Sequence, residues 1–165
     1  MTLHRARIVL PLSSPPVENG AVLVQAPDIV AVGRFEEIRA DHPNVEIVDH
    51  GESILLPGLI NAHCHLDYTV MRGAIFHTGS FSAWVRRINE IKRTLSDEDY
   101  LASITLGLQE LKKWGTTTVL NIESLPELMV HMPPPPIRTW WFYELLDIRN
   151  RIHTEDVVAG ALTFF

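Results

Sequence analysis

Apolar and polar positions follow two different periods along this chain, and each period predicts its own kind of structure. Up to about residue 54, short apolar runs alternate with turn residues, a pattern typical of strands. Asn19-Gly20 is typical of a hairpin turn, and 35–40 has room for one or two helical turns. The pattern therefore predicts a small β-rich domain over 1–54, with strands at 5–10, 20–25, 28–33 and 45–49.

From residue 54 the pattern becomes strand, helix, helix, strand. Apolar spacing predicts one amphipathic helix from Phe81 to Leu95 and a second one after Ser96, which can cap that helix together with Asp99. Strands joined through helices become parallel neighbours. We therefore expect three parallel strands, side by side in chain order, near 55–62, 116–122 and 139–146.

The candidate chemistry lies at the end of the first of these strands. Pro57 to Asp67 reads Pro-Gly-Leu-Ile-Asn-Ala-His-Cys-His-Leu-Asp. Side chains two apart on a strand share a face, so His63 and His65 can reach one metal ion while Cys64 points away. Parallel α/β folds carry their sites at the carboxyl ends of strands. Histidines in a strand also form ordinary hydrogen bonds, so the spacing alone leaves both interpretations open.

Composition narrows the class of protein. The net charge is −6 and the cationic residues form no cluster, which argues against nucleic acid as a partner. Cys64 is the only cysteine, so an internal disulfide is excluded. The first residues lack the apolar core of a signal peptide, and no apolar run approaches the ~20 residues that cross a bilayer. We expect a cytoplasmic protein with a small-molecule substrate and no membrane partner.

The segment Leu56–Asp67 resembles the first-strand motif of the amidohydrolase superfamily, and most of all its cytosine-deaminase and chlorohydrolase-like branch. Met71-Arg-Gly73, Ser80-Phe-Ser-Ala-Trp84 and Gly115-Thr-Thr-Thr-Val119 fit the same family pattern. The resemblance implies an α/β fold: the N-terminal part of a (β/α)8 metal-dependent hydrolase barrel with a small β-sandwich-like domain. Residues 55–165 would then form the first three β/α units of an incomplete barrel.

The resemblance also implies an activity. It implies a hydrolase of C–N bonds other than peptide bonds, which deaminates an aminated heterocycle or nucleoside-like substrate with a metal-activated water. The opening of the helix at Ser80–Trp84 is similar to that of adenosine-type and aminofutalosine-type deaminases, which favours a purine-bearing substrate. The alternatives are a chlorohydrolase or cyclic-amide hydrolase of the same family and, in another class, a non-catalytic fragment or binding partner.

His63 and His65 would supply two ligands to a divalent metal, with zinc expected first and iron or manganese as alternatives. The resemblance implies that the other ligands and the catalytic acid–base groups come from later strands, beyond residue 165. We therefore expect this chain to be the N-terminal part of a longer enzyme and to be inactive alone. The full-length form could be a homo-oligomer.

Five further residues are candidates for substrate contact, each with an ordinary structural alternative. Asp67 would meet substrate or orient a ligand histidine, or else cap a loop. Glu123 and Glu144 end strands where barrel sites are built, but carboxylates there also cap helices. Trp84 would stack on a substrate ring or pack in the core. Arg72 would bind an anionic group or remain solvated.

Overall fold

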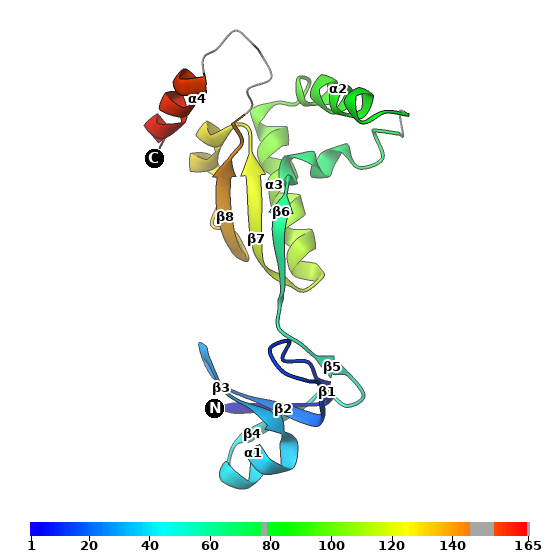
Figure 1. Cartoon of the computed structure of the whole chain (residues 1–165), viewed down its shortest axis with the longest axis vertical. Helices are drawn as coiled ribbons and strands as arrows, with labels where there is room; N and C mark the ends of the chain where they lie inside the picture. The colour runs from blue at the N-terminus through cyan, green and yellow to red at the C-terminus, as the bar shows by residue number, and fades with distance from the viewer. Residues whose placement is uncertain (77–78, 146–153, 165) are drawn as a thin grey trace. The chain divides into compact units, whose positions relative to one another are not determined.

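The computed structural model describes residues 1–76, 79–145 and 154–164. The chain divides into two compact units, Met1–Pro57 and Gly58–Phe165 (Figure 1).

The first unit is a single five-stranded sheet with one helix. The strand order is β3-β2-β1-β4, and β5 pairs with the other end of β1. β1 is antiparallel to β2 and parallel to β4 and β5. Leu3, Ala21, Leu23 and Ile38 form its buried core. The elements are β1 (Thr2–Val9), β2 (Val17–Gln25), β3 (Asp28–Arg34), α1 (Phe35–Asp41), β4 (Glu46–Asp49) and β5 (Ile54–Leu55).

Two local predictions for this region were wrong. Asn19 and Gly20 lie inside β2 and form no hairpin turn, because Gly20 pairs with Ala6 of β1. A Cβ at Gly20 would lie 2.7 Å from Val9 Cγ2. Ile54 and Leu55 pair with β1, so the strand predicted near 55–62 begins only at Leu59.

The second unit is built on a three-stranded sheet in the order β6-β7-β8. All its pairings are parallel, which confirms the predicted order and direction of the three strands. Residue 146, the predicted end of the last strand, lies outside the described residues. The elements are β6 (Leu59–Cys64), η1 (Leu66–Met71), α2 (Phe81–Lys92), α3 (Asp97–Lys113), β7 (Thr116–Glu123), η2 (Pro126–His131), β8 (Arg138–Tyr143), α4 (Thr154–Ala161) and η3 (Leu162–Phe164).

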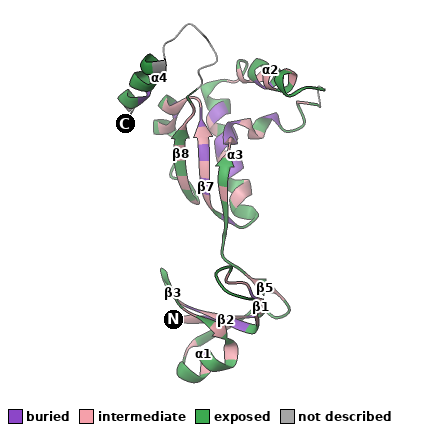
Figure 2. Cartoon of the chain, viewed as in Figure 1, coloured by how far each residue is buried: buried purple, intermediate pink, exposed green. Residues whose placement is uncertain are grey.

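α3 covers one face of this sheet (Figure 1). Ser96 and Asp99 form the predicted capping box at its start, each side chain bonding to the backbone of the other. Its buried residues pack against β7, where Figure 2 shows burial concentrated. The core cluster comprises Leu66, Tyr100, Ile104, Leu108, Val119 and Leu128.

The opposite face of the sheet carries exposed apolar side chains. Strand pairing sets Leu120 beside Trp140 and Ile122 beside Phe142, on the positions that alternate with the buried ones. Ile60 is 69% exposed and Trp140 59%. We call Ile60, Leu120, Ile122, Trp140 and Phe142 the open face. Among the described residues, the helices are all too short or too polar to cross a membrane.

Candidate metal and substrate site

The pairing of β6 with β7 is irregular near the carboxyl end of β6, next to the two histidines. Asn61 pairs with Val119 and Cys64 with Asn121, both of which are buried positions of β7, and the register shifts between the two pairs. A bulge therefore leaves two residues, rather than one, between Asn61 and Cys64. Cys64 packs against the core cluster, and burial raises the pKa of its thiol.

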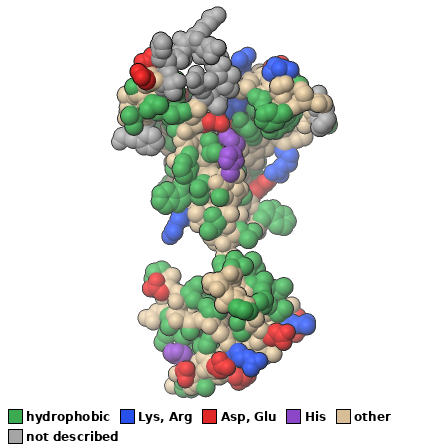
Figure 3. Space-filling model, viewed as in Figure 1, with side chains coloured by type: hydrophobic (Ala, Val, Ile, Leu, Met, Phe, Trp, Pro, Cys, Tyr) green, Lys and Arg blue, Asp and Glu red, His purple; other side chains and the backbone are tan. Residues whose placement is uncertain are grey.

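His63 and His65 come together on either side of Cys64. Their ring centroids are 5.4 Å apart, with the planes at 66°. Histidine side chains lie over the carboxyl end of β6 in Figure 3, on the face turned away from α3. The His65 ring also stacks on Tyr68 at 5.1 Å, and its Nδ1 is buried without a hydrogen-bond partner. Within the described residues, no set of three or more His, Cys, Asp or Glu side chains is arranged to hold a metal ion.

Asp67 begins a buried polar cluster next to this pair. It is 0% exposed, so a substrate cannot reach its carboxylate in this conformation. Lys92 Nζ lies 2.6 Å from Asp67 Oδ2 and 2.7 Å from Ser124 Oγ. The ammonium group also lies 5.0 Å from the centre of the Tyr68 ring. Lys92 thereby joins α2 to the carboxyl ends of β6 and β7.

Glu123, at the end of β7, is the second buried carboxyl group. Tyr100 donates a hydrogen bond of 2.7 Å to Glu123 Oε2, and Asn121 Nδ2 donates to Oε1. Burial raises the pKa of Glu123 to about 7, and the two hydrogen bonds only partly offset this effect. Burial also raises the pKa of Tyr100, as does its bond to Glu123.

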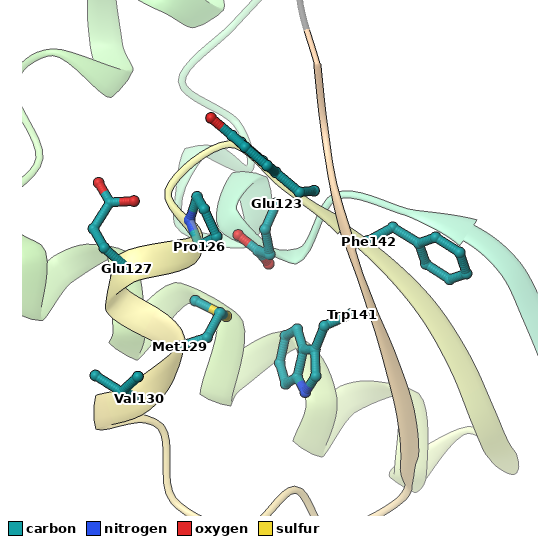
Figure 4. A pocket seen from close by; sticks show the side chains of 8 residues that line it. Glu123, Pro126, Glu127, Met129, Val130, Trp141 and Phe142 are labelled. Atoms are coloured by element: carbon teal, nitrogen blue, oxygen red, sulfur yellow. The ribbon is translucent and has the colours of Figure 1, made fainter. Parts of the chain in front are cut away.

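A hollow of about 350 Å³ lies beside Glu123, between η2 and β8 (Figure 4). Its walls include Met129, Val130 and Trp141. Because Tyr100 and Asn121 already bond to the Glu123 carboxylate, the hollow is suited mainly to an apolar or aromatic group. Glu144 follows β8, is half-buried, and donates its backbone N–H to the carbonyl of Glu123 at 2.8 Å.

Arg72 and Trp84 are not part of this cluster. Arg72 is exposed and forms a bidentate ion pair with Glu110 of α3. Its Nη1 donates to Oε1 of Glu110 at 2.9 Å and its Nη2 to Oε2 at 2.5 Å. Trp84 is 39% exposed and contacts Phe81 at a centroid distance of 5.7 Å. It lies outside the core cluster, at the surface of α2.

The sequence analysis missed three residues of the buried polar cluster: Lys92, Tyr100 and Asn121. One signal was present: Lys92 stands four residues after Ile88, the buried residue of α2, and so shares its face. Asn121 and Glu123 likewise alternate with Val119, a buried position of β7. A polar residue in an apolar register indicates a buried hydrogen-bond network.

A parallel sheet backed by a helix defines an α/β protein, and its histidine pair lies at the strand end where barrels of this class carry their sites. Residues 54–130 match the model of the Amidohydrolase family. The chain belongs to the amidohydrolase superfamily.

Relatives and solved structures agree with this assignment. A 5-methylthioadenosine/S-adenosylhomocysteine deaminase of Nitratidesulfovibrio vulgaris is 32% identical over 101 residues, which cover 61% of this chain and 23% of the relative. The aminofutalosine deaminase of Helicobacter pylori, in complex with methylthio-coformycin, superposes with a TM-score of 0.80 at 22% identity, over 98% of this chain and 39% of that one.

Atrazine chlorohydrolase of Arthrobacter aurescens, complexed with zinc, has a TM-score of 0.74 at 21% identity. The superposition covers 99% of this chain and 42% of the chlorohydrolase. These likenesses establish the fold as the N-terminal part of an amidohydrolase (β/α)8 barrel. The chain thus spans less than half the length of each protein it matches here.

Proposed function

We propose that this chain belongs to a metal-dependent hydrolase of C–N bonds that deaminates an aminated heterocycle or nucleoside-like substrate. The observation that carries the proposal is the meeting of the His63 and His65 rings at the carboxyl end of the first parallel strand. We further propose that 1–54 is the small domain and 55–165 the first three β/α units of the barrel.

The two histidines fit a divalent metal. Both are imidazoles at one strand end, and the burial of His65 Nδ1 leaves Nε2 as the nitrogen available to a metal. A bound zinc ion would lower the pKa of water towards ~7 and so supply a nucleophile near neutral pH. The zinc in the chlorohydrolase structure supports zinc ahead of iron or manganese.

Two of the predicted substrate contacts keep that role in the proposal. Glu144 is half-buried at the end of β8, where barrel enzymes bind substrate. Trp84 is partly exposed on α2 and free to stack on a planar ring. Arg72, occupied by Glu110, would bind an anionic group only after giving up that ion pair.

Deamination is favoured over dechlorination by the names of the relatives. The sequence relative at 32% identity is named a deaminase of methylthioadenosine and S-adenosylhomocysteine, whereas the chlorohydrolase matches at 21% identity. This difference supports a purine-bearing substrate.

The single cysteine, which has no disulfide partner, supports a reducing compartment such as the cytoplasm.

The metal site is tested by titrating the chain with zinc while recording the ring-nitrogen NMR signals of its histidines. We expect the signals of His63 and His65 to shift together, and His63→Ala to weaken zinc binding at least tenfold because a ligand is lost. His42→Ala, in the first unit, is the matched control. Equal zinc binding by His63→Ala and the unsubstituted chain would refute the site.

The activity is tested by measuring ammonia release from aminopurine nucleosides and aminopyrimidines, with chlorinated and cyclic-amide compounds in parallel. Hydrolytic zinc sites use about three protein ligands, and the described residues bring two together. We therefore expect no turnover from residues 1–165 alone with zinc, iron or manganese. Turnover by this chain would show that another of its residues completes the site.

A further inference from the structure

Two buried polar atoms at the end of β6 lack a partner. In the part of the chain that the structure describes, the buried side-chain nitrogen and oxygen atoms without a hydrogen bond are His65 Nδ1 and Asp67 Oδ1. One is a ring nitrogen that can donate, and the other is a carboxylate oxygen that accepts. Buried polar groups nearly always have partners in folded proteins. Both atoms therefore need a partner that this conformation does not supply.

We propose that Asp67 is a positioning residue for His65, accepting the Nδ1 hydrogen when Nε2 binds a metal, and that Lys92 holds Asp67 for this task. The inference rests on the proposed metal site. A ligating imidazole commonly donates its other N–H to a carboxylate, which fixes its tautomer and the direction of its ring. Asp67 thereby acts through His65 and does not bind substrate.

The surroundings of Asp67 favour this role. Its carboxylate has no exposed surface, and Lys92 Nζ fixes Oδ2 from 2.6 Å. Ser124 Oγ and the Tyr68 ring hold the same ammonium group from other sides. One carboxylate oxygen is thus anchored by a charge, while the other remains available for a neighbouring donor.

The surroundings of His65 are equally fixed. Its ring lies parallel to that of Tyr68, with 10° between the planes. Leu66 N donates to Asn121 Oδ1 at 2.9 Å, and Ser103 Oγ lies 3.0 and 2.9 Å from the carbonyl oxygens of Leu66 and Asp67. β7 and α3 therefore hold the backbone of the segment that carries both side chains.

The test replaces the ion pair in two ways that leave no unpaired charge in the interior. Asp67→Leu with Lys92→Met removes both the acceptor and the charge, whereas Asp67→Asn with Lys92→Met keeps an acceptor oxygen. Apolar replacement of a buried ion pair usually preserves folding. Circular dichroism and thermal unfolding establish that each variant is folded before its zinc affinity and histidine NMR spectra are compared.

We expect the Leu/Met variant to bind zinc about 10- to 100-fold more weakly, and the Asn/Met variant within a few-fold of the unsubstituted chain. The Nδ1–H signal of zinc-loaded His65 should persist in the Asn/Met variant and be lost by exchange in the Leu/Met variant. Unchanged zinc affinity and an unchanged Nδ1–H signal in a folded Leu/Met variant would overturn the role of Asp67 but leave the metal site standing. Absence of any zinc-induced shift in the unsubstituted chain would overturn the metal site and this inference with it.

Discussion

Glu123 is held between Tyr100 and Asn121 with 1% of its surface exposed, and burial disfavours its charged form. The pKa of its carboxyl group rises from 4.5 to about 7. The folded state therefore holds this proton more tightly than the unfolded chain. Stability from this residue is fully present below pH 4.5 and is lost as the pH rises through about 7.

The pH dependence of unfolding tests this statement. From pH 5 to pH 8, the contribution of Glu123 should lower the free energy of unfolding by about 2 kcal/mol. Because Glu123→Gln cannot ionise, the free energy of unfolding of the variant should rise relative to that of the parent by about 2 kcal/mol over the same pH range. Urea denaturation at several pH values measures it, and Glu127→Gln, at an exposed carboxyl group, is the control. Parallel curves for Glu123→Gln and the parent would contradict the prediction.

At the level of elements, α3 packs so closely on η1 that only a glycine fits at position 107. A Cβ there would lie 2.6 Å from Thr69 Oγ1 and 2.8 Å from Leu66 Cδ2. Leu66 belongs to the core cluster and Thr69 Oγ1 is bonded to the Leu66 carbonyl, so neither atom can withdraw freely.

Gly107→Ala should therefore lower the free energy of unfolding by about 1–3 kcal/mol, although alanine favours helices. Gly160→Ala, in α4, meets no atom within 4 Å and should leave stability equal or raise it by up to about 1 kcal/mol. Chemical denaturation compares the two substitutions directly. A stabilised Gly107→Ala variant would show that α3 and η1 do not approach this closely.

The start of α3 offers a second test at this level. Ser96 Oγ accepts the backbone N–H of Asp99 at 3.1 Å, and Asp99 Oδ2 accepts that of Ser96 at 3.2 Å. Ser96→Ala should cost about 1 kcal/mol of unfolding free energy, and Ser96→Asn should restore most of it because asparagine also caps helices well. Equal stability of all three proteins would mean that the cap contributes nothing.

For the second unit as a whole, the open face presents apolar side chains next to a parallel sheet edge. Exposed apolar surface of this kind promotes self-association. Trp140→Lys should reduce light scattering and the binding of a hydrophobic dye, with little change in the free energy of unfolding, because this indole is 59% exposed. Trp114→Lys, which removes a 73% exposed indole at the end of α3, is the control. Equal effects of the two substitutions would refute a special role for the open face.

The sequence by itself determined most of the elements of this protein and the chain order of its parallel strands. The helical stripe of α3, its cap at Ser96 and the β-branched run of β7 are local patterns, and each predicted its element within a few residues. The spacing of His63 and His65 also predicted that their rings lie close together, although His65 follows the end of β6. Local periodicity fixes which side chains share a face, so these features needed no knowledge of distant residues.

Only the tertiary structure decided which apolar run joins which sheet and which way the histidines turn. Ile54 and Leu55 are as apolar as the residues of β6, yet they pair with β1. The bulge between Asn61 and Cys64 arises from pairing with β7, and the Asp67–Lys92 ion pair joins residues 25 positions apart. Such choices depend on packing and charge between segments far apart in the chain, which no local pattern encodes.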